Sequence, residues 1–298
     1  MTSYDAPLPA DLCTLLDEAW AVRNRHWPTT ITASFPVDTL PVSVTGHQCE
    51  LSCAHCAGHY LRGMRPLAEL SRVLATSILV SGGCDRSGKV PVGQYLEMLR
   101  PLLNGRRSNW HLGLVSDPDL AALQPLLDVV SFDFVGDDET IREVYGLDVS
   151  VDDYEKCFAT LSRVTEVVPH ITIGLHAGII CHEYAALERL TGYNFRSLVL
   201  LVLVPTPGTT YAAVEPPPVP DAVRVIATAR QLFPTVALHL GCMRPRGQYG
   251  QTLDILAVRA GVNVIVNPGQ SVWAAAAELG LTWQTNHECC VFASVAHA

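Results

Sequence analysis

Positive charge is scarce in this sequence of 298 residues. It has 20 lysines and arginines against 29 acidic residues, and its formal net charge is −9. Binding to a nucleic-acid backbone needs clustered positive charge, which neutralises the phosphates. The composition therefore excludes nucleic acid as the main partner.

Long hydrophobic runs are also missing, although hydrophobic residues make up 49% of the chain. The strongest run, at 197–204, has the length of a strand, whereas a membrane helix needs roughly 18 apolar residues or more. The first residues lack the basic and then apolar order of a signal peptide. We expect no membrane span and a cytoplasmic protein.

Paired metal-binding motifs are absent too, because the chain has ten cysteines but a single C-x2-C. A cytoplasmic compartment keeps thiols reduced, so disulfides are not expected. The cysteines are then metal ligands, reactive thiols or small buried side chains.

Apolar runs rich in Val, Ile and Leu recur along the chain, each followed by a stretch that can form a helix. Continuous apolar strands are typical of parallel sheets that are buried on both faces. Eight such repeats predict an α/β fold, a closed (βα)8 barrel of the TIM type. The eight predicted strands are 41–46, 77–83, 111–116, 129–135, 170–178, 197–205, 236–241 and 262–268.

Both ends of the chain lie outside these repeats. Residues 10–27 have apolar side chains at helical spacing, so we expect residues 1–40 to form an N-terminal helical extension. The barrel is expected to cover 41–282. Residues 283–298 form a C-terminal tail, a candidate segment for a second cluster, with two adjacent cysteines that could lie over the barrel mouth.

Three cysteines lie within eight residues, directly after the first predicted strand, in the stretch TGHQCELSCAHCAGHYL. Barrel enzymes build their active sites at this end of the strands. Zinc is one reading, because a nearby histidine could provide a fourth ligand. The cysteines are Cys49, Cys53 and Cys56, and the histidines are His47, His55 and His59.

The spacing C-x3-C-x2-C, with the aromatic His55 before the third cysteine, resembles the signature of the radical S-adenosylmethionine (SAM) enzymes. The resemblance implies that Cys49, Cys53 and Cys56 hold three irons of a 4Fe-4S cluster. It also implies that the amino and carboxylate groups of SAM bind the fourth iron. Reductive cleavage of SAM then yields a 5'-deoxyadenosyl radical, which abstracts hydrogen from carbon.

Further residues match positions at which this family contacts SAM. The sequence SGGC after the second strand resembles the glycine-rich turn that contacts the SAM amino group, although Cys84 stands where an acidic residue is frequent. Strands four and five lie where the family contacts ribose and adenine, and two arginines follow strand seven. The candidate cofactor-binding residues are Gly82, Gly83, Ser131, Asp133, His176, Arg244 and Arg246.

The stretches VSGGCDRSGKVP, VVSFDFVGDDETIREVYGL, LVPTPGTTY and LGCMRPRG resemble biotin synthase homologues that include the two-protein lipoyl synthases. This resemblance implies sulfur insertion into a protein-bound octanoyl chain. The implied partners are a second radical SAM subunit, an octanoylated lipoyl domain and a low-potential electron donor.

Sulfur insertion in this group draws on a second iron-sulfur cluster, which needs ligands of its own. We expect Cys242, Cys289 and Cys290 to be these ligands, with Cys84 as a fourth. The chain departs from biotin synthase proper, because its third and fifth strands have no cysteine. A lone cysteine at a strand end is also commonly a small buried residue.

Two other functions stay open from the sequence. One is a radical SAM enzyme with a single cluster, acting in cofactor maturation or carbon-skeleton rearrangement. The other is a zinc-stabilised barrel without enzymatic activity, although a barrel of this size needs no metal to fold.

Overall fold

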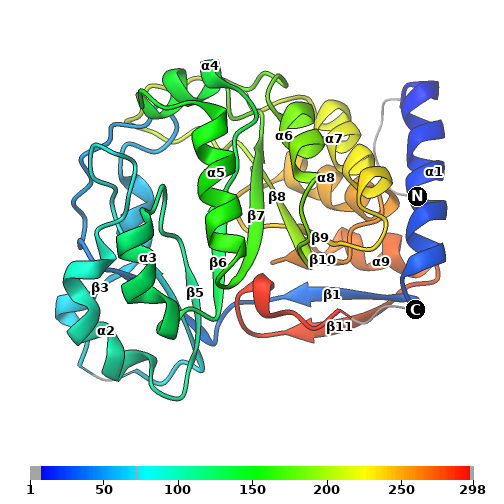
Figure 1. Cartoon of the computed structure of the whole chain (residues 1–298). Coiled ribbons are helices and arrows are strands. Elements are labelled where there is room, and N and C mark those ends of the chain that lie inside the picture. Colours follow the sequence, from blue (N-terminus) through cyan, green and yellow to red (C-terminus); the bar gives the residue numbers. More distant parts are fainter. Residues whose placement is uncertain (1–7, 72, 296–298) are drawn as a thin grey trace.

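A single sheet of eleven strands runs through the molecule in the order β11-β1-β10-β9-β8-β7-β6-β5-β4-β2-β3 (Figure 1). The computed structural model describes residues 8–71 and 73–295. All strand pairs are parallel. The strands are β1 Thr30–Ser34, β2 Thr39–Ser43, β3 Arg65–Pro66, β4 Ser77–Ser81, β5 Arg107–Trp110, β6 Val129–Asp133, β7 Glu166–Ile173, β8 Ser197–Val202, β9 Ala237–Leu240, β10 Val264–Val266 and β11 Thr282–Asn286.

Helices cover the outer face of this curled sheet (Figure 1). The α-helices are α1 Ala10–His26, α2 Leu96–Leu103, α3 Asp117–Leu123, α4 Asp138–Thr140, α5 Val151–Ser162, α6 Glu183–Leu190, α7 Val219–Leu232, α8 Gln248–Arg259 and α9 Ser271–Glu278. The short helices are η1 His59–Gly63, η2 Leu67–Glu69, η3 Val92–Tyr95, η4 Gln124–Leu126, η5 Ile141–Tyr145 and η6 Cys290–Phe292.

Helix α5 shows how the local sequence sets these elements. Ser150 and Asp153 form a reciprocal capping box, which satisfies free N–H groups at the helix start. Phe158 and Leu161 then lie on the buried face, fully enclosed in the core. Charged residues on the other face stay in solvent, so the helix has one orientation on the sheet.

The predicted closed eight-stranded barrel is wrong, because the sheet is an open, partial barrel that ends at β11 and β3. Strand β1 pairs with β10 and β11, at the far edge from β2. Only residues 35–38 separate β1 from β2, whereas neighbouring parallel strands need a crossover of about a dozen residues. This short link keeps the two strands from pairing.

The ends of the chain contribute more to the sheet than was predicted. Residues 1–40 were expected to form a helical extension, and α1 is present, but β1 also belongs to this stretch. Strand β11 lies where an irregular tail was expected to begin. Both are short and rich in threonine and other polar residues, so their apolar signal is weak.

The third predicted strand is shifted, because β5 is Arg107–Trp110 and not 111–116. Its first residues are polar, yet Ser108 and Asn109 are buried. Ser108 donates a hydrogen bond to the carbonyl oxygen of Leu126 and also contacts Asp128. Polar side chains can enter a strand when they find such partners, which hydrophobic periodicity does not reveal.

The segment after β11 lies at the N-terminal ends of the strands and not over the opposite mouth. The backbone N–H of Cys289 donates to Thr39 Oγ1 at 2.7 Å, and Glu288 pairs with Arg107. Thr39 and Arg107 are the first residues of their strands. Helix η6 packs under strand residues such as Val168 and Val199, so this segment forms the floor of the partial barrel.

An ion pair fixes the loop after β9. The guanidinium of Arg244 donates to Asp254 at 2.8 and 3.1 Å and to the carbonyl oxygens of Gly241 and Val266. The side chains of Arg244 and Asp254 are only 1% and 3% exposed. This pair ties the β9 loop to α8.

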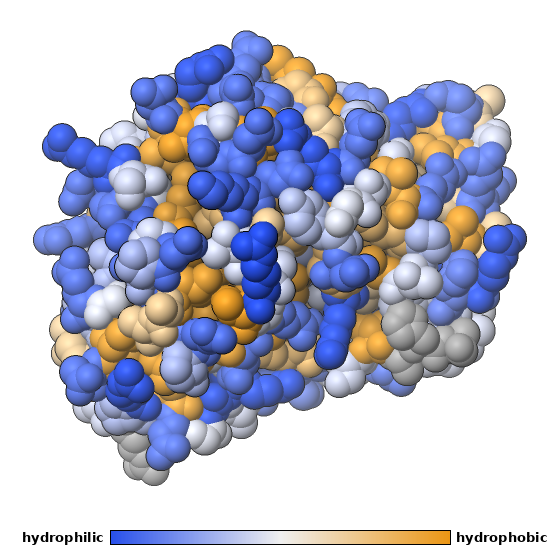
Figure 2. All heavy atoms as spheres, in the orientation of Figure 1, coloured by the Kyte–Doolittle hydropathy of each residue, from blue (hydrophilic) through white to orange (hydrophobic). Residues whose placement is uncertain are grey.

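Surface composition agrees with a helical outer layer. On the face shown in Figure 2, hydrophilic side chains alternate with smaller hydrophobic areas. No helix within residues 8–71 and 73–295 combines the length and apolar character that crossing a membrane requires.

Replacing Asp254 with alanine should destabilise the protein, because it leaves the buried Arg244 charge unpaired. We expect a loss of about 3–5 kcal/mol in the free energy of unfolding, measured by urea denaturation. Asp17, whose side chain is 77% exposed beside Arg259, provides the matched control. Asp17→Ala should cost less than about 1 kcal/mol. Equal effects of the two substitutions would contradict the structural role of the buried pair.

Candidate active site

The cysteine loop follows β2 at the C-terminal end of the sheet, where the sequence placed it. Backbone N–H groups of Cys56 and Ala57 both donate to the carbonyl oxygen of Cys53, which closes a tight turn. Ala57 and Gly58 have φ angles of 41° and 77°, so the chain reverses through the left-handed region after the third cysteine. The turn brings the three thiols to one side of the loop.

The glycine turn after β4 packs directly against this loop. A Cβ atom on Gly83 would lie 2.0 Å from the carbonyl oxygen of Gln48 and 2.5 Å from Cα of Cys49. The Gly83 N–H also donates to Thr45 Oγ1 at 2.7 Å. Only glycine lets the two backbones approach so closely. The turn therefore fixes where the cysteine loop stands relative to the sheet.

A cavity of about 450 Å³ lies between the cysteine loop and the floor. All three loop thiols line it, and so do Gly82 and Gly83 of the glycine turn. The predicted second group of cysteines also lines it, namely Cys84, Cys242, Cys289 and Cys290. One cavity thus joins both sets of thiols.

The two thiols of Cys53 and Cys56 interact directly. Their mutual hydrogen bond lowers the pKa of Cys56 and raises that of Cys53, with burial and other nearby thiols adding to the rise. His55 beside them also lowers the pKa of Cys56. Of these two thiols, Cys56 is therefore the one on which the thiolate is favoured.

Histidines of the loop take different positions. His55 lines the cavity, with its ring edge-on to Tyr60 and Tyr145. His59 donates from Nδ1 to the Cys56 carbonyl oxygen at 3.0 Å, which supports the turn. His47 is exposed.

Polar residues from neighbouring strands form the middle of the cavity. Asp133 at the end of β6 lies 3.8 Å from Nδ1 of His111. Burial opposes the charge on each group, but the interaction between them outweighs it, lowering the pKa of Asp133 and raising that of His111. Ser131 donates to Asn109 Oδ1 at 2.9 Å. Ser131 and Asp133 thus lie in the cavity, as expected.

Cys289 and Cys290 rise into this cavity from the floor. The amide of Asn109 donates to Cys289 Sγ at 3.5 Å. Interaction with Cys290 lowers the pKa of Cys289, against the effect of burial, and His111 adds to the lowering. A thiolate is therefore favoured on Cys289, whereas the same interaction and burial raise the pKa of Cys290.

Cys84 belongs with the first thiol set. Its carbonyl oxygen accepts from the N–H of Glu50 at 2.8 Å and from the Cys49 thiol at 3.8 Å. Burial raises the pKa of the Cys84 thiol to about 12, with Cys49 contributing. Cys242 lines the opposite wall, and the charge of Cys289 raises its pKa in addition to burial.

Three predicted cofactor-binding residues lie elsewhere. His176 follows the end of β7 and contacts Thr140 Oγ1 at 3.2 Å, outside the cavity lining. Arg244 is committed to its ion pair with Asp254. Arg246 is exposed and turns back to the Cys242 and Asn267 carbonyl oxygens. Arg244 is thus a structural residue and not a free binding group.

Sequence reasoning missed several cavity residues. Asn109, His111 and His170 all line the cavity, and none was selected from the sequence. Asn109 lies on β5, whose predicted position was displaced, and His170 reads as an ordinary polar residue at a strand start. Residues 109 and 111 are two positions apart, so their side chains point to the same face of an extended chain. This spacing was the signal available in the sequence.

The donor set fits an iron-sulfur cluster held by the loop. Three thiols line one cavity beside a glycine turn that admits no Cβ atom at Gly83. No three Cys, His, Asp or Glu side chains in the described part of the chain are grouped around one metal ion position. The cysteine ligands of a cubane cluster bind different irons, so they lie further apart than the ligands of a single ion. The absence of such a group among the described residues therefore concerns a site for one metal ion.

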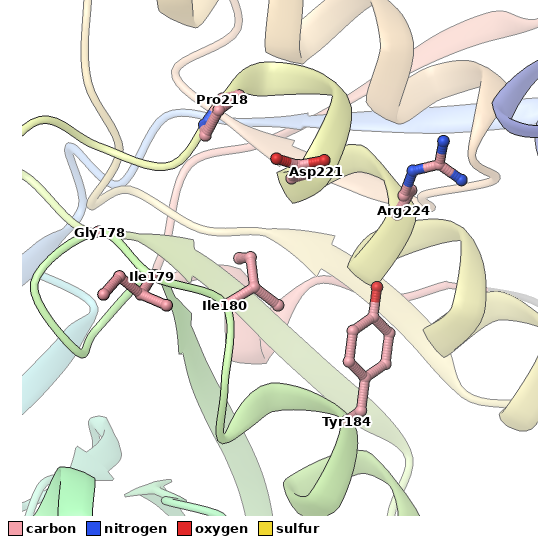
Figure 3. Close-up of a pocket in the computed structure, with 7 residues that line it drawn as sticks. All are labelled: Gly178, Ile179, Ile180, Tyr184, Pro218, Asp221 and Arg224. Atoms are coloured by element: carbon pink, nitrogen blue, oxygen red, sulfur yellow. The ribbon is translucent and has the colours of Figure 1, made fainter. Parts of the chain in front are cut away.

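A second, shallower pocket of about 480 Å³ lies on the outer surface (Figure 3). Ile179 and Ile180 come from the β7–α6 loop, Tyr184 from α6, and Asp221 and Arg224 from α7. It contains none of the cysteines. We therefore assign the chemistry to the inner cavity.

Comparisons with known proteins agree with this site. No family model matches the chain. A biotin synthase of Delftia acidovorans is 27% identical over 276 residues, which cover 84% of this chain and 74% of that protein. The fold resembles methylornithine synthase (PylB), with a TM-score of 0.66, 14% identity and coverage of 94% and 91% of the two chains. It also resembles the FeFe-hydrogenase maturase HydG of Carboxydothermus hydrogenoformans, with a TM-score of 0.64, 16% identity and coverage of 94% and 73%.

The curled parallel sheet is similar to the folds of these two solved structures, and the sequence is distantly similar to biotin synthase. At the level of sequence the chain is therefore biotin synthase-like. The resemblance of the cysteine loop to the radical SAM signature implies a 4Fe-4S cluster, and Cys49, Cys53 and Cys56 are the residues that would hold it.

Substituting Gly83 with alanine should displace the cysteine loop, because the new Cβ atom meets the Gln48 carbonyl oxygen. We expect most of the iron to be lost after anaerobic reconstitution, measured as iron per chain. Gly63→Ala is the control, since nothing lies within 4 Å of its Cβ position. Full iron content in the Gly83 variant would show that the close approach is not needed for the cluster.

Proposed function

We propose that this enzyme inserts sulfur into a protein-bound octanoyl chain, as one subunit of a lipoyl synthase of the two-protein type. The supporting observation is the chemistry of the cavity wall. It is largely apolar, and the described residues that line it include no lysine, arginine or glutamate and only one aspartate, Asp133. The aliphatic residues are Leu51, Leu61, Leu79, Val90, Leu114, Leu147, Val199, Leu201, Val202, Leu203 and Val204.

Such a wall favours an uncharged alkyl substrate. A free carboxylic acid would bring a charge into the cavity without a lysine or arginine to pair with it, and His111 is already paired with Asp133, so its burial is costly. An octanoyl group in amide linkage to a lysine has no charge. The carboxylate of SAM needs no such residue, because in this superfamily it binds iron.

The roles of this chain's residues follow from their positions. The bound cluster and SAM supply the radical that removes hydrogen from the alkyl chain. The loop cysteines hold the cluster at one end of the cavity, and Gly82 and Gly83 leave room for SAM. Asp133 offers a carboxylate to hydroxyl or amino groups, with His111 balancing its charge.

The floor is the proposed position of the sulfur source. Cys289 and Cys290 of the floor line the same cavity as the cysteine loop, and so does Cys242, which follows the C-terminal end of β9, so an alkyl chain in the cavity reaches both sets of thiols. We propose that these three cysteines hold a second iron-sulfur cluster. Cys84 is left out, because it packs against the Cys49 loop. A low-potential donor would supply electrons, and a second radical SAM subunit would be the partner.

The substrate can be tested directly with an octanoylated lipoyl domain, SAM and reductant under anaerobic conditions. We expect 5'-deoxyadenosine and a sulfur-containing acyl product, detected by mass spectrometry. Free octanoate should react at least about tenfold more slowly, because its carboxylate would be buried unpaired. Cys49→Ala, which lacks a loop ligand, is the inactive control. A faster reaction with the free acid would contradict the proposed substrate.

Iron content tests the second cluster. The reconstituted chain should hold more than about four irons, and Cys289→Ala or Cys242→Ala should lower the number towards four. Cys157→Ala is a matched control, because this buried cysteine lies on α5 outside the cavity lining. If wild type holds only about four irons, the proposal gives way to a radical SAM enzyme with one cluster.

A further inference from the structure

A buried histidine lies directly above the floor cysteines. His170, on β7, is 7% exposed and lines the cavity. Cys290 packs with Val168 and Val199. Val168 is two residues before His170 on the same face of β7, and Val199 is its cross-strand partner on β8. The imidazole and the floor thiols therefore share one region of the cavity.

One nitrogen of His170 is fixed by the backbone. Nδ1 lies 3.0 Å from the carbonyl oxygen of Val168. A carbonyl oxygen only accepts, so Nδ1 must be the donor and carries the proton. In the neutral ring Nε2 then has a free lone pair. Histidines that bind metals commonly have this arrangement, with the other nitrogen donating to a carbonyl group.

The neighbours of His170 complete a set of donors. Its ring centroid is 5.4 Å from that of His111, in an edge-to-face arrangement. Asn109 lies on β5, two residues before His111, and its side-chain amide donates to Cys289 Sγ at 3.5 Å. Cysteine and histidine from three separate segments thus meet around the lower half of the cavity.

We propose that His170 is a ligand of the second iron-sulfur cluster, binding iron through Nε2 beside the thiolates of the floor. The cluster then has mixed sulfur and nitrogen ligation, with Cys242, Cys289 and Cys290 as the sulfur ligands already proposed. This assignment rests on the proposed second cluster and adds a residue that was not among the expected ligands. Histidine ligation raises the reduction potential of an iron-sulfur cluster relative to all-cysteine ligation.

The experiment uses the full chain, reconstituted anaerobically without SAM, so that the SAM amino group contributes no nitrogen signal. Nitrogen hyperfine coupling to the reduced clusters is measured by pulsed EPR, with and without 15N-labelled histidine. In wild type we expect more than about four irons per chain and a coupling that changes with the label.

Two variants of one residue separate ligation from folding. His170→Cys should keep the iron but lose the histidine coupling, and the potential of the second cluster should fall. His170→Ala should lower the iron towards about four per chain. Subsequent addition of SAM should still change the EPR signal of the first cluster in both variants, which shows that the fold is intact.

His239 provides the matched control. It lies on β9, is 1% exposed and is a cross-strand partner of Val199, like His170, but it is not part of the cavity lining. His239→Gln should leave the iron and the coupling unchanged.

Several outcomes would overturn the assignment. If more than about four irons are present but the histidine coupling persists in His170→Cys, another histidine is the ligand. If the histidine coupling is lost in His239→Gln but not in the His170 variants, His239 on β9 is the ligand. Iron near four in wild type would overturn both the second cluster and its histidine ligand.

Discussion

The contact between the glycine turn and the cysteine loop fixes the geometry on which the site depends. At Gly83 the two backbones approach to a distance that no side chain allows. This contact seats the three loop thiols over the C-terminal end of the sheet and brings Cys84 beside Cys49. The loop has few other regular elements to hold it, since only two short helices and the two-residue strand β3 follow it before β4. Its position is thus set mainly by a steric constraint between two βα turns.

The cavity below that contact divides into an upper and a lower half with different chemistry. Thiols of the cysteine loop enclose the upper half, and the walls between are mostly aliphatic. Hydrogen-bonded polar groups such as Ser131 and Asn109, and the thiols of η6, occupy the lower half. Buried polar groups need partners, and here they find one another and the floor segment. The proposed alkyl substrate suits the apolar walls, and the proposed clusters suit the thiols at the two ends.

Local patterns predicted the parts of this architecture that depend on neighbouring residues. The spacing of Cys49, Cys53 and Cys56 lies within one loop, and the apolar strands β6 to β10 are continuous in sequence, so both were predictable. The open sheet could not be predicted in this way. Whether the sheet closes depends on how β1 pairs, and that pairing joins residues far apart in the sequence. The role of Arg244 depends on Asp254 one helix further on, and His170 gains its meaning only from residues that fold beneath it.

The floor also has a consequence for biosynthesis. Cys289 follows Cys49 by about 240 residues, so a ribosome making roughly 5–20 residues per second completes the cysteine loop well before the floor segment. The lower part of the cavity can therefore be closed only after the cysteine loop has been made. The two sets of thiols are synthesised in a fixed order, the loop first and the floor second.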